Sequence, residues 1–144
     1  MKQELLDKKE FLMSYQSEYS RARQCMREIE QIRELGDCLD QAGENLQAMG
    51  AKTGMHGWVE QLEEISQQLE QQVERALTAR SAVSACLDGV EDERYRTLLR
   101  SRYLLGQTWD EVAQNMYMDE RWVRRLHLRA LEELVLPGKA SVAV

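Results

Sequence analysis

Residues 108–134 read TWDEVAQNMYMDERWVRRLHLRALEEL, and this stretch decides how the rest of the chain is interpreted. It contains a short and then a longer helical pattern of apolar residues, separated by a turn. Thr108 followed by Glu111 predicts a capping box at the start of the first helix, and Asp119 predicts the N-cap of the second. This order is the helix-turn-helix arrangement, whose second helix enters the major groove of DNA in many proteins.

The second helix is expected to turn its arginines away from its apolar face. Helical spacing places Arg121 and Arg125 opposite that face, with Arg124 beside them. An arginine can donate two hydrogen bonds to guanine or bridge phosphate oxygens, which favours a DNA contact. The alternative, that these side chains are solvated or paired with nearby carboxylates, stays open. The apolar face consists of Val123, Leu126, Ala130 and Leu134, and the preceding helix adds the basic residues Arg94, Arg96, Arg100 and Arg102.

A domain boundary is expected between residues 89 and 90. Asp88-Gly89 predicts the end of a helix, and three acidic residues from 91 to 93 suit the positive end of the next one. Arg102 lies on the inner flank of that next helix, so we expect it to be partly buried. A buried guanidinium needs a partner, and Glu111 is the predicted one, in a structural ion pair.

The first 89 residues carry two long amphipathic patterns, from about Lys2 to Leu35 and from about Gly57 to Leu87. The glycine-containing stretch between them predicts a loop, with room for one short helical turn around residues 46–49. Two helices with narrow seams fit an antiparallel hairpin, although the same seam can also face a second subunit.

The predicted fold class is therefore all-α. A long antiparallel helical hairpin, residues 1–89, is followed by a three-helix domain, residues 90–136, and a flexible tail, residues 137–144.

Composition and charge restrict the class of protein. The net charge of −6 excludes a clamp on nucleic acid that uses the whole surface, so any basic site must be local. The absence of a long apolar run and of a signal-type N-terminus predicts a cytoplasmic protein without a membrane partner. We find no nucleophile–base pair, phosphate-binding loop or metal-ligand spacing, so no enzyme, cofactor or metal is expected. An odd number of cysteines predicts reduced thiols, at Cys25, Cys38 and Cys86.

The aromatic residues and histidines have separate expectations. His127 falls on the inward side of the last helix, which predicts a hydrogen-bonded core residue rather than a catalytic base or a ligand. Trp109 lies on an apolar face and is expected in the core too. For Trp122, off that face, stacking on nucleic acid and a surface position both stay open. His56 stands alone in the glycine-containing stretch.

Residues 95–134, YRTLLRSRYLLGQTWDEVAQNMYMDERWVRRLHLRALEEL, resemble region 4 of sigma-70-type factors, without a gap from Thr108 to Leu134. The likeness includes the T-x-x-E-V-A opening, the acidic and arginine residues that begin the last helix, and the R-A-L-x-x-L close. Over the whole chain, the long N-terminal helices and the glycine-bearing loop are similar to sigma-region-4-like regulators of phages and prophages, the ArpU/RinA-type late-gene regulators. The resemblance implies a sigma region 4-like helix-turn-helix domain that controls transcription.

The resemblance also implies particular contact residues. The base- and backbone-contacting positions of the family's recognition helix fall on Glu120, Arg121, Arg124 and Arg125, and Thr108 matches a phosphate-contacting position.

Two residues depart from the family pattern. Tyr117 stands where sigma factors often have glycine or another turn-tolerant residue, and Glu120 stands where they often have a basic residue. We therefore expect a changed base preference.

The expected function is a phage- or prophage-type transcription regulator that reads duplex DNA with its C-terminal helix-turn-helix. A second copy of the chain, as a homodimer, and RNA polymerase are the other expected partners. The alternative is a sigma-like interaction protein that binds RNA polymerase or another sigma factor and has little DNA affinity. Its support is the negative net charge and the long N-terminal seam.

Overall fold

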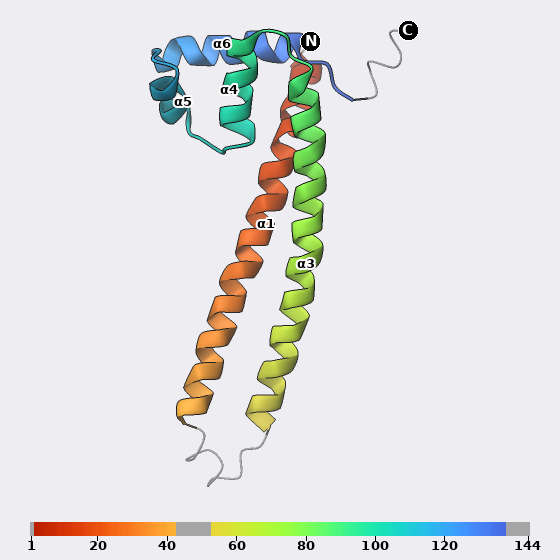
Figure 1. Ribbon diagram of the computed structural model, residues 1–144, viewed down its shortest axis with the longest axis vertical. Helices are drawn as coiled ribbons and strands as arrows, with labels where there is room; N and C mark the ends of the chain where they lie inside the picture. Colours follow the sequence, from red (N-terminus) through yellow and green to blue (C-terminus); the bar gives the residue numbers. More distant parts are fainter. Residues whose placement is uncertain (1, 43–52, 138–144) are drawn as a thin grey trace. The chain divides into compact units, whose positions relative to one another are not determined.

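The structure, a computed structural model, describes residues 2–42 and 53–137, and within these ranges it is helical without strands (Figure 1). The all-α class is therefore confirmed. The helices are α1 (Lys2–Gln41), α3 (Thr53–Asp88), α4 (Glu93–Tyr103), α5 (Trp109–Asn115) and α6 (Glu120–Glu133).

The chain forms two compact units. Residues 1–17 and 76–144 make one, here called the terminal unit, and residues 18–75 make the other, the middle unit. The first turns of α1 and the last turns of α3 thus belong with α4, α5 and α6. This division differs from the boundary expected between residues 89 and 90. Of the expected tail, residues 137–144, all but Pro137 lies outside the described residues.

Both long helices extend beyond the limits expected from the sequence. α1 continues through Gly36 to Gln41, and α3 begins at Thr53, so the prediction that the loop starts at Gly36 is wrong. Gly36 is buried, and a Cβ atom at this position would overlap the indole ring of Trp58. The glycine therefore permits a close side-chain approach rather than a turn. The short turn expected around residues 46–49 lies outside the described residues.

In the middle unit, the segments of α1 and α3 run antiparallel (Figure 1). The Gln72 side chain donates to the backbone carbonyl of Glu18 at 3.1 Å, and the Trp58 indole N–H donates to the carbonyl of Ile32. Early residues of one segment therefore meet late residues of the other. The seam between them is narrow, since few of its side chains are fully buried; these include Ala22, Ile29 and Gln72.

The terminal unit has a denser core. Leu12 from α1 and Leu87 from α3 are both fully buried in the same apolar cluster as side chains of α4, α5 and α6. Helices α4 and α5 each pack against α6. The other side chains of this core that are completely inaccessible to solvent are Val83, Leu98, Leu99, Val112, Val123, Ala130 and Leu131.

The three short helices begin at capping residues, two of which the sequence predicts. Asp92 caps α4 by accepting from the N–H groups of Arg94 and Tyr95, and Asp119 caps α6 by accepting from Arg121 N–H. Thr108 and Glu111 form the capping box of α5. Each cap satisfies N–H groups that have no partner inside the helix, and so fixes where the helix starts.

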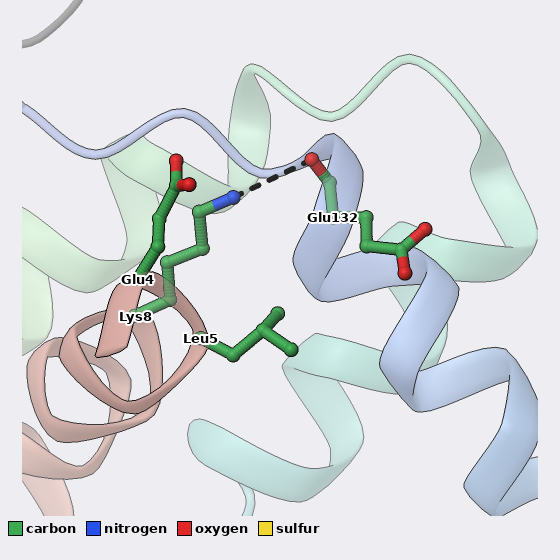
Figure 2. Close-up of a pocket in the computed structure, with 4 residues that line it drawn as sticks. All are labelled: Glu4, Leu5, Lys8 and Glu132. Atoms are coloured by element: carbon green, nitrogen blue, oxygen red, sulfur yellow. Dashed lines mark hydrogen bonds between the residues drawn. The ribbon is translucent and has the colours of Figure 1, made fainter. Parts of the chain in front are cut away.

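A buried lysine joins the start of α1 to the end of α6. Lys8 is 5% exposed, and its Nζ donates to the backbone carbonyls of Leu131 at 2.7 Å and Glu132 at 3.4 Å. Figure 2 shows Lys8 reaching toward α6 from a small pocket that Glu4, Leu5 and Glu132 also line. The last carbonyls of a helix lack helical partners and carry partial negative charge, so the ammonium group stabilises this end of α6.

Candidate nucleic-acid interface

The turn between α5 and α6 depends on a residue in the left-handed region. Tyr117 has a φ of 55°, and its side chain is 95% exposed. Met118 N–H then donates to the carbonyl of Ala113 at 3.0 Å, which closes the end of α5. A left-handed conformation costs a non-glycine residue free energy, and the exposed ring gains little packing in return. In the sequence, this is one of the two positions expected to depart from the sigma-factor pattern.

Helix α6 has two chemically different faces. Its inner face is buried against the rest of the terminal unit through Val123, Leu126, His127, Ala130 and Leu131. On the outer face, the guanidinium-bearing side chains of Arg121, Arg124 and Arg125 are exposed. The buried face fixes the rotation of α6 about its axis, so the arginines are held toward solvent without taking part in the core.

The three arginines differ in their partners. Arg124 forms an ion pair with Glu120 one helical turn earlier, at 3.0 Å. Arg121 and Arg125 have no carboxylate partner within residues 2–42 and 53–137. The alternative reading, in which nearby carboxylates neutralise the arginines, therefore applies to Arg124 alone. Two exposed guanidinium groups remain available for an external anion or base edge.

Thr108 is occupied as a helix cap. Its Oγ1 accepts from Glu111 N–H at 3.2 Å and lies 3.1 Å from a carboxylate oxygen of Glu111. The residue is exposed at the start of α5, as the predicted phosphate contact requires. Its hydroxyl group is already engaged, so such a contact would compete with the capping box.

The predicted ion pair between Arg102 and Glu111 is wrong. Arg102 instead donates to the backbone carbonyl of Gln107 at 2.9 Å, and its guanidinium carbon lies 4.5 Å from the centre of the Trp109 ring. Glu111 is committed to Thr108. Arg102 is partly buried, as expected, but a carbonyl and an aromatic face stabilise it.

Other arginines of α4 also have local partners. Arg96 donates to the carbonyl of Val90 at 2.9 Å, and Arg100 forms an ion pair with Asp88 at 3.3 Å. Both contacts connect α4 to the end of α3 or to the residues that follow it. The local basic charge counted from the sequence is thus partly used in holding α4 in place.

His127 lies in the core beneath the arginines, as predicted. Its Nε2 and the Tyr103 hydroxyl are 2.6 Å apart. The Trp109 ring meets the imidazole edge-on, with the two ring centres 4.6 Å apart. Burial lowers the pKa of His127 to about 4, with smaller contributions from the positive charges of Lys9 and Arg102. The imidazole is therefore neutral near neutral pH. Burial also raises the pKa of Tyr103 to about 12, so the phenol keeps the proton that the pair shares.

Sequence reasoning missed how the tryptophans meet the arginines. Trp109 packs against the core. Arg102 lies over its ring, and the guanidinium carbon of Arg124 lies 6.0 Å from the ring centre. Trp122 is 39% exposed, and Arg129 lies 5.6 Å from its ring centre. The arginine at i+7 from Trp122 was a usable signal, because that spacing places two residues on one helix face.

Other kinds of site have little support in the described ranges. Groups of three or more His, Cys, Asp or Glu side chains placed to hold a metal ion are absent there. Helices apolar enough over a membrane-spanning length are also absent from the part of the chain that the structure describes. Cys25, Cys38 and Cys86 are free thiols.

Comparisons with protein-family models, with curated proteins and with solved structures give no match for this chain. The outer face of α6 is the feature of the described residues that bears most directly on function.

Proposed function

We propose that this chain is a DNA-binding transcription regulator of the phage or prophage type, acting in the cytoplasm. In this proposal α5 and α6 form a sigma region 4-like helix-turn-helix, and the paired segments of α1 and α3 form a helical hairpin. The observation that carries it is the exposure of Arg121 and Arg125, without a carboxylate partner in the described residues, on a helix whose opposite face is buried.

The mechanism follows from the two faces of α6. With the inner face held by the core, the first turns of α6 can enter the major groove, where a guanidinium group can donate to O6 and N7 of guanine. Arg124 would have to leave Glu120 before it contacts DNA, and Glu120 would then be free to accept from a cytosine amino group. At a base pair that offers no such donor, the Glu120 carboxylate would stay unpaired near the phosphates, which disfavours that sequence.

The test is to replace Arg121 and Arg125 together. The R121A/R125A variant should lose specific binding to duplex fragments taken from the gene's own genomic neighbourhood, measured by fluorescence anisotropy. Each lost bidentate contact with guanine should cost roughly 1–3 kcal/mol, whereas a lost phosphate contact should weaken all sequences alike and reduce the salt slope by about one. Scrambled duplexes separate the two cases.

A matched control is R27A/R75A, which removes the same charge from exposed arginines of the middle unit. It should leave binding to the specific duplex unchanged. If both variants lost the same affinity for the specific duplex, net charge alone would explain the effect. The proposed DNA-reading role of α6 would then be wrong.

A second candidate function is an interaction protein that binds RNA polymerase or another sigma factor. The Glu120–Arg124 ion pair at 3.0 Å and the net charge of −6 favour it, because both weaken attraction to phosphates. In this case the wild-type chain should bind none of the duplexes but should retain RNA polymerase in a pull-down. R121A/R125A should then behave like the wild type toward DNA.

A further inference from the structure

The paired segments of the middle unit have two flanks with different chemistry. In heptad notation, Ala22 and Ile29 of α1 and Leu62 and Leu69 of α3 occupy position a in the seam. In an antiparallel pair the two helices are related by a two-fold axis, so residues at position e of both helices line one flank. Residues at position g line the other. The e flank consists of Tyr19, Met26, Arg33, Val59, Ser66 and Val73, and the g flank consists of Arg21, Glu28, Leu35, Gln61, Gln68 and Arg75.

Exposed apolar side chains gather on the e flank. Tyr19, Met26, Val59 and Val73 are large apolar residues with 42%, 54%, 40% and 39% of their surface exposed. The g flank has one such residue, Leu35, among polar and charged neighbours. Because the seam between the two helices is narrow, it does not cover the e flank, and the apolar side chains of this flank remain in contact with water.

We propose that the e flank pairs with the e flank of a second copy of the chain, in an antiparallel two-fold arrangement centred on Met26 and Ser66. The residue types at equal distances from this centre point to this occupant, because position e itself recurs every seven residues in any such helix. On α3, valines stand seven residues before and seven after Ser66, so Val59 of one copy meets Val73 of the other.

On α1, the two-fold arrangement places a second cation near an aromatic ring. Tyr19, whose ring centre lies 5.9 Å from the Arg23 guanidinium carbon of its own chain, and Arg33 stand seven residues before and seven after Met26, so each ring would also have a guanidinium group of the other copy nearby. At the centre, Met26 meets its own copy beside the small Ser66, and a flexible thioether fills such a space readily. An isologous interface requires this kind of order, in which residue i meets j and j meets i.

Charges at the rim agree with the arrangement on one helix and oppose it on the other. Arg23 and Glu30 are almost equally distant from Met26, so they attract across the interface. Glu63 and Glu70 are about equally distant from Ser66 and repel. Exposed rim charges are screened by salt, so the apolar pairs decide whether the copies associate.

The first test uses the full chain and analytical ultracentrifugation. Wild type should dimerise, and Met26→Glu should weaken the dimer at least about 30-fold, because it buries two like charges at the two-fold axis. The matched control is Leu35→Glu, on the same helix at a residue of 58% exposure but on the g flank. A monomeric wild type, or equal effects of the two substitutions, would overturn the proposal.

The second test fixes the orientation. Glu70→Lys should tighten an antiparallel dimer, since Lys would face Glu63 of the other copy. In a parallel dimer it would face Arg23 and weaken the association, which would overturn the arrangement proposed. With the three native cysteines replaced (C25A/C38S/C86A), Met26→Cys should form a disulfide-linked dimer under mild oxidation, whereas Leu35→Cys should not.

The proposed dimer does not depend on DNA binding. A dimer that binds no duplex would remove the proposed function and leave this inference standing, and a monomer that binds DNA would do the reverse.

Discussion

The terminal unit and the middle unit use apolar side chains in different ways. In the terminal unit, leucines from α1, α3, α4 and α6 are completely buried in one cluster. In the middle unit the seam leucines, Leu62 and Leu69, are only half-buried, and two side-chain to backbone hydrogen bonds, from Trp58 and Gln72, connect the helices. A close-packed core holds α6 in one orientation, whereas a narrow seam leaves apolar surface for a further contact.

The two units are therefore suited to different roles. A surface that reads bases needs side chains fixed on a rigid element, and the outer face of α6 is supported in that way by its buried face. The middle unit provides length and an apolar flank instead.

Matched leucine truncations should have unequal costs. Leu131→Ala removes a completely buried side chain of α6 and should lower the free energy of unfolding by roughly 2–5 kcal/mol. Leu69→Ala, at a half-buried seam position, should cost about 1 kcal/mol, because less apolar surface returns to water. Urea denaturation followed by circular dichroism measures both. Similar costs would mean that the two units are equally well packed.

The buried histidine should make the terminal unit sensitive to acid. The pKa of His127 is about 4 in the folded chain and about 6.5 when unfolded, so between these values the unfolded chain binds more protons. The free energy of unfolding should be undiminished above pH 6.5 and should fall by about 3 kcal/mol in total as the pH drops to 4.

The control for this effect is His127→Gln, which cannot titrate but keeps polar atoms near the Tyr103 hydroxyl. Its stability should change less between pH 6.5 and 4 than that of the wild type. An identical pH dependence in both proteins would assign the acid sensitivity to other groups.

The smallest effect should come from the turn before α6. Tyr117→Gly should raise the free energy of unfolding by about 1 kcal/mol, because glycine adopts a φ of 55° without the penalty that a Cβ atom brings. Tyr117→Ala should be nearly neutral, since it keeps the Cβ atom and removes a ring that is 95% exposed. Thermal unfolding of the two variants side by side measures the difference. If both variants were more stable than the wild type, the exposed ring rather than the backbone conformation would be the source of the destabilisation.

The sequence predicted the features that depend on near neighbours. The capping box of Thr108 and Glu111, the Asp119 cap and the buried position of His127 follow from spacing within one or two turns, and the structure confirms them. The separation of exposed arginines from the packing face of α6 has the same local origin. Whether Arg121 and Arg125 contact DNA stays a prediction.

The failures involve partners distant in sequence or competing for one group. Gly36 has the composition signal of a helix break, but Trp58, on the other helix, makes a small residue necessary within α1. The Glu111 carboxylate is bonded to Thr108 in the capping box, so it does not pair with Arg102 as predicted. Helical periodicity identifies faces but cannot rank such competing partners.

The contact made by Lys8 has a consequence for synthesis of the chain on the ribosome. Its hydrogen bond to Leu131 joins residues 123 positions apart, and the terminal unit as a whole combines residues 1–17 with residues 76–144. The paired segments of the middle unit, by contrast, are complete once residue 75 has emerged. We therefore expect folding during translation to begin with the helices that lie between, because the last carbonyls of α6 can meet Lys8 only after that helix has left the exit tunnel.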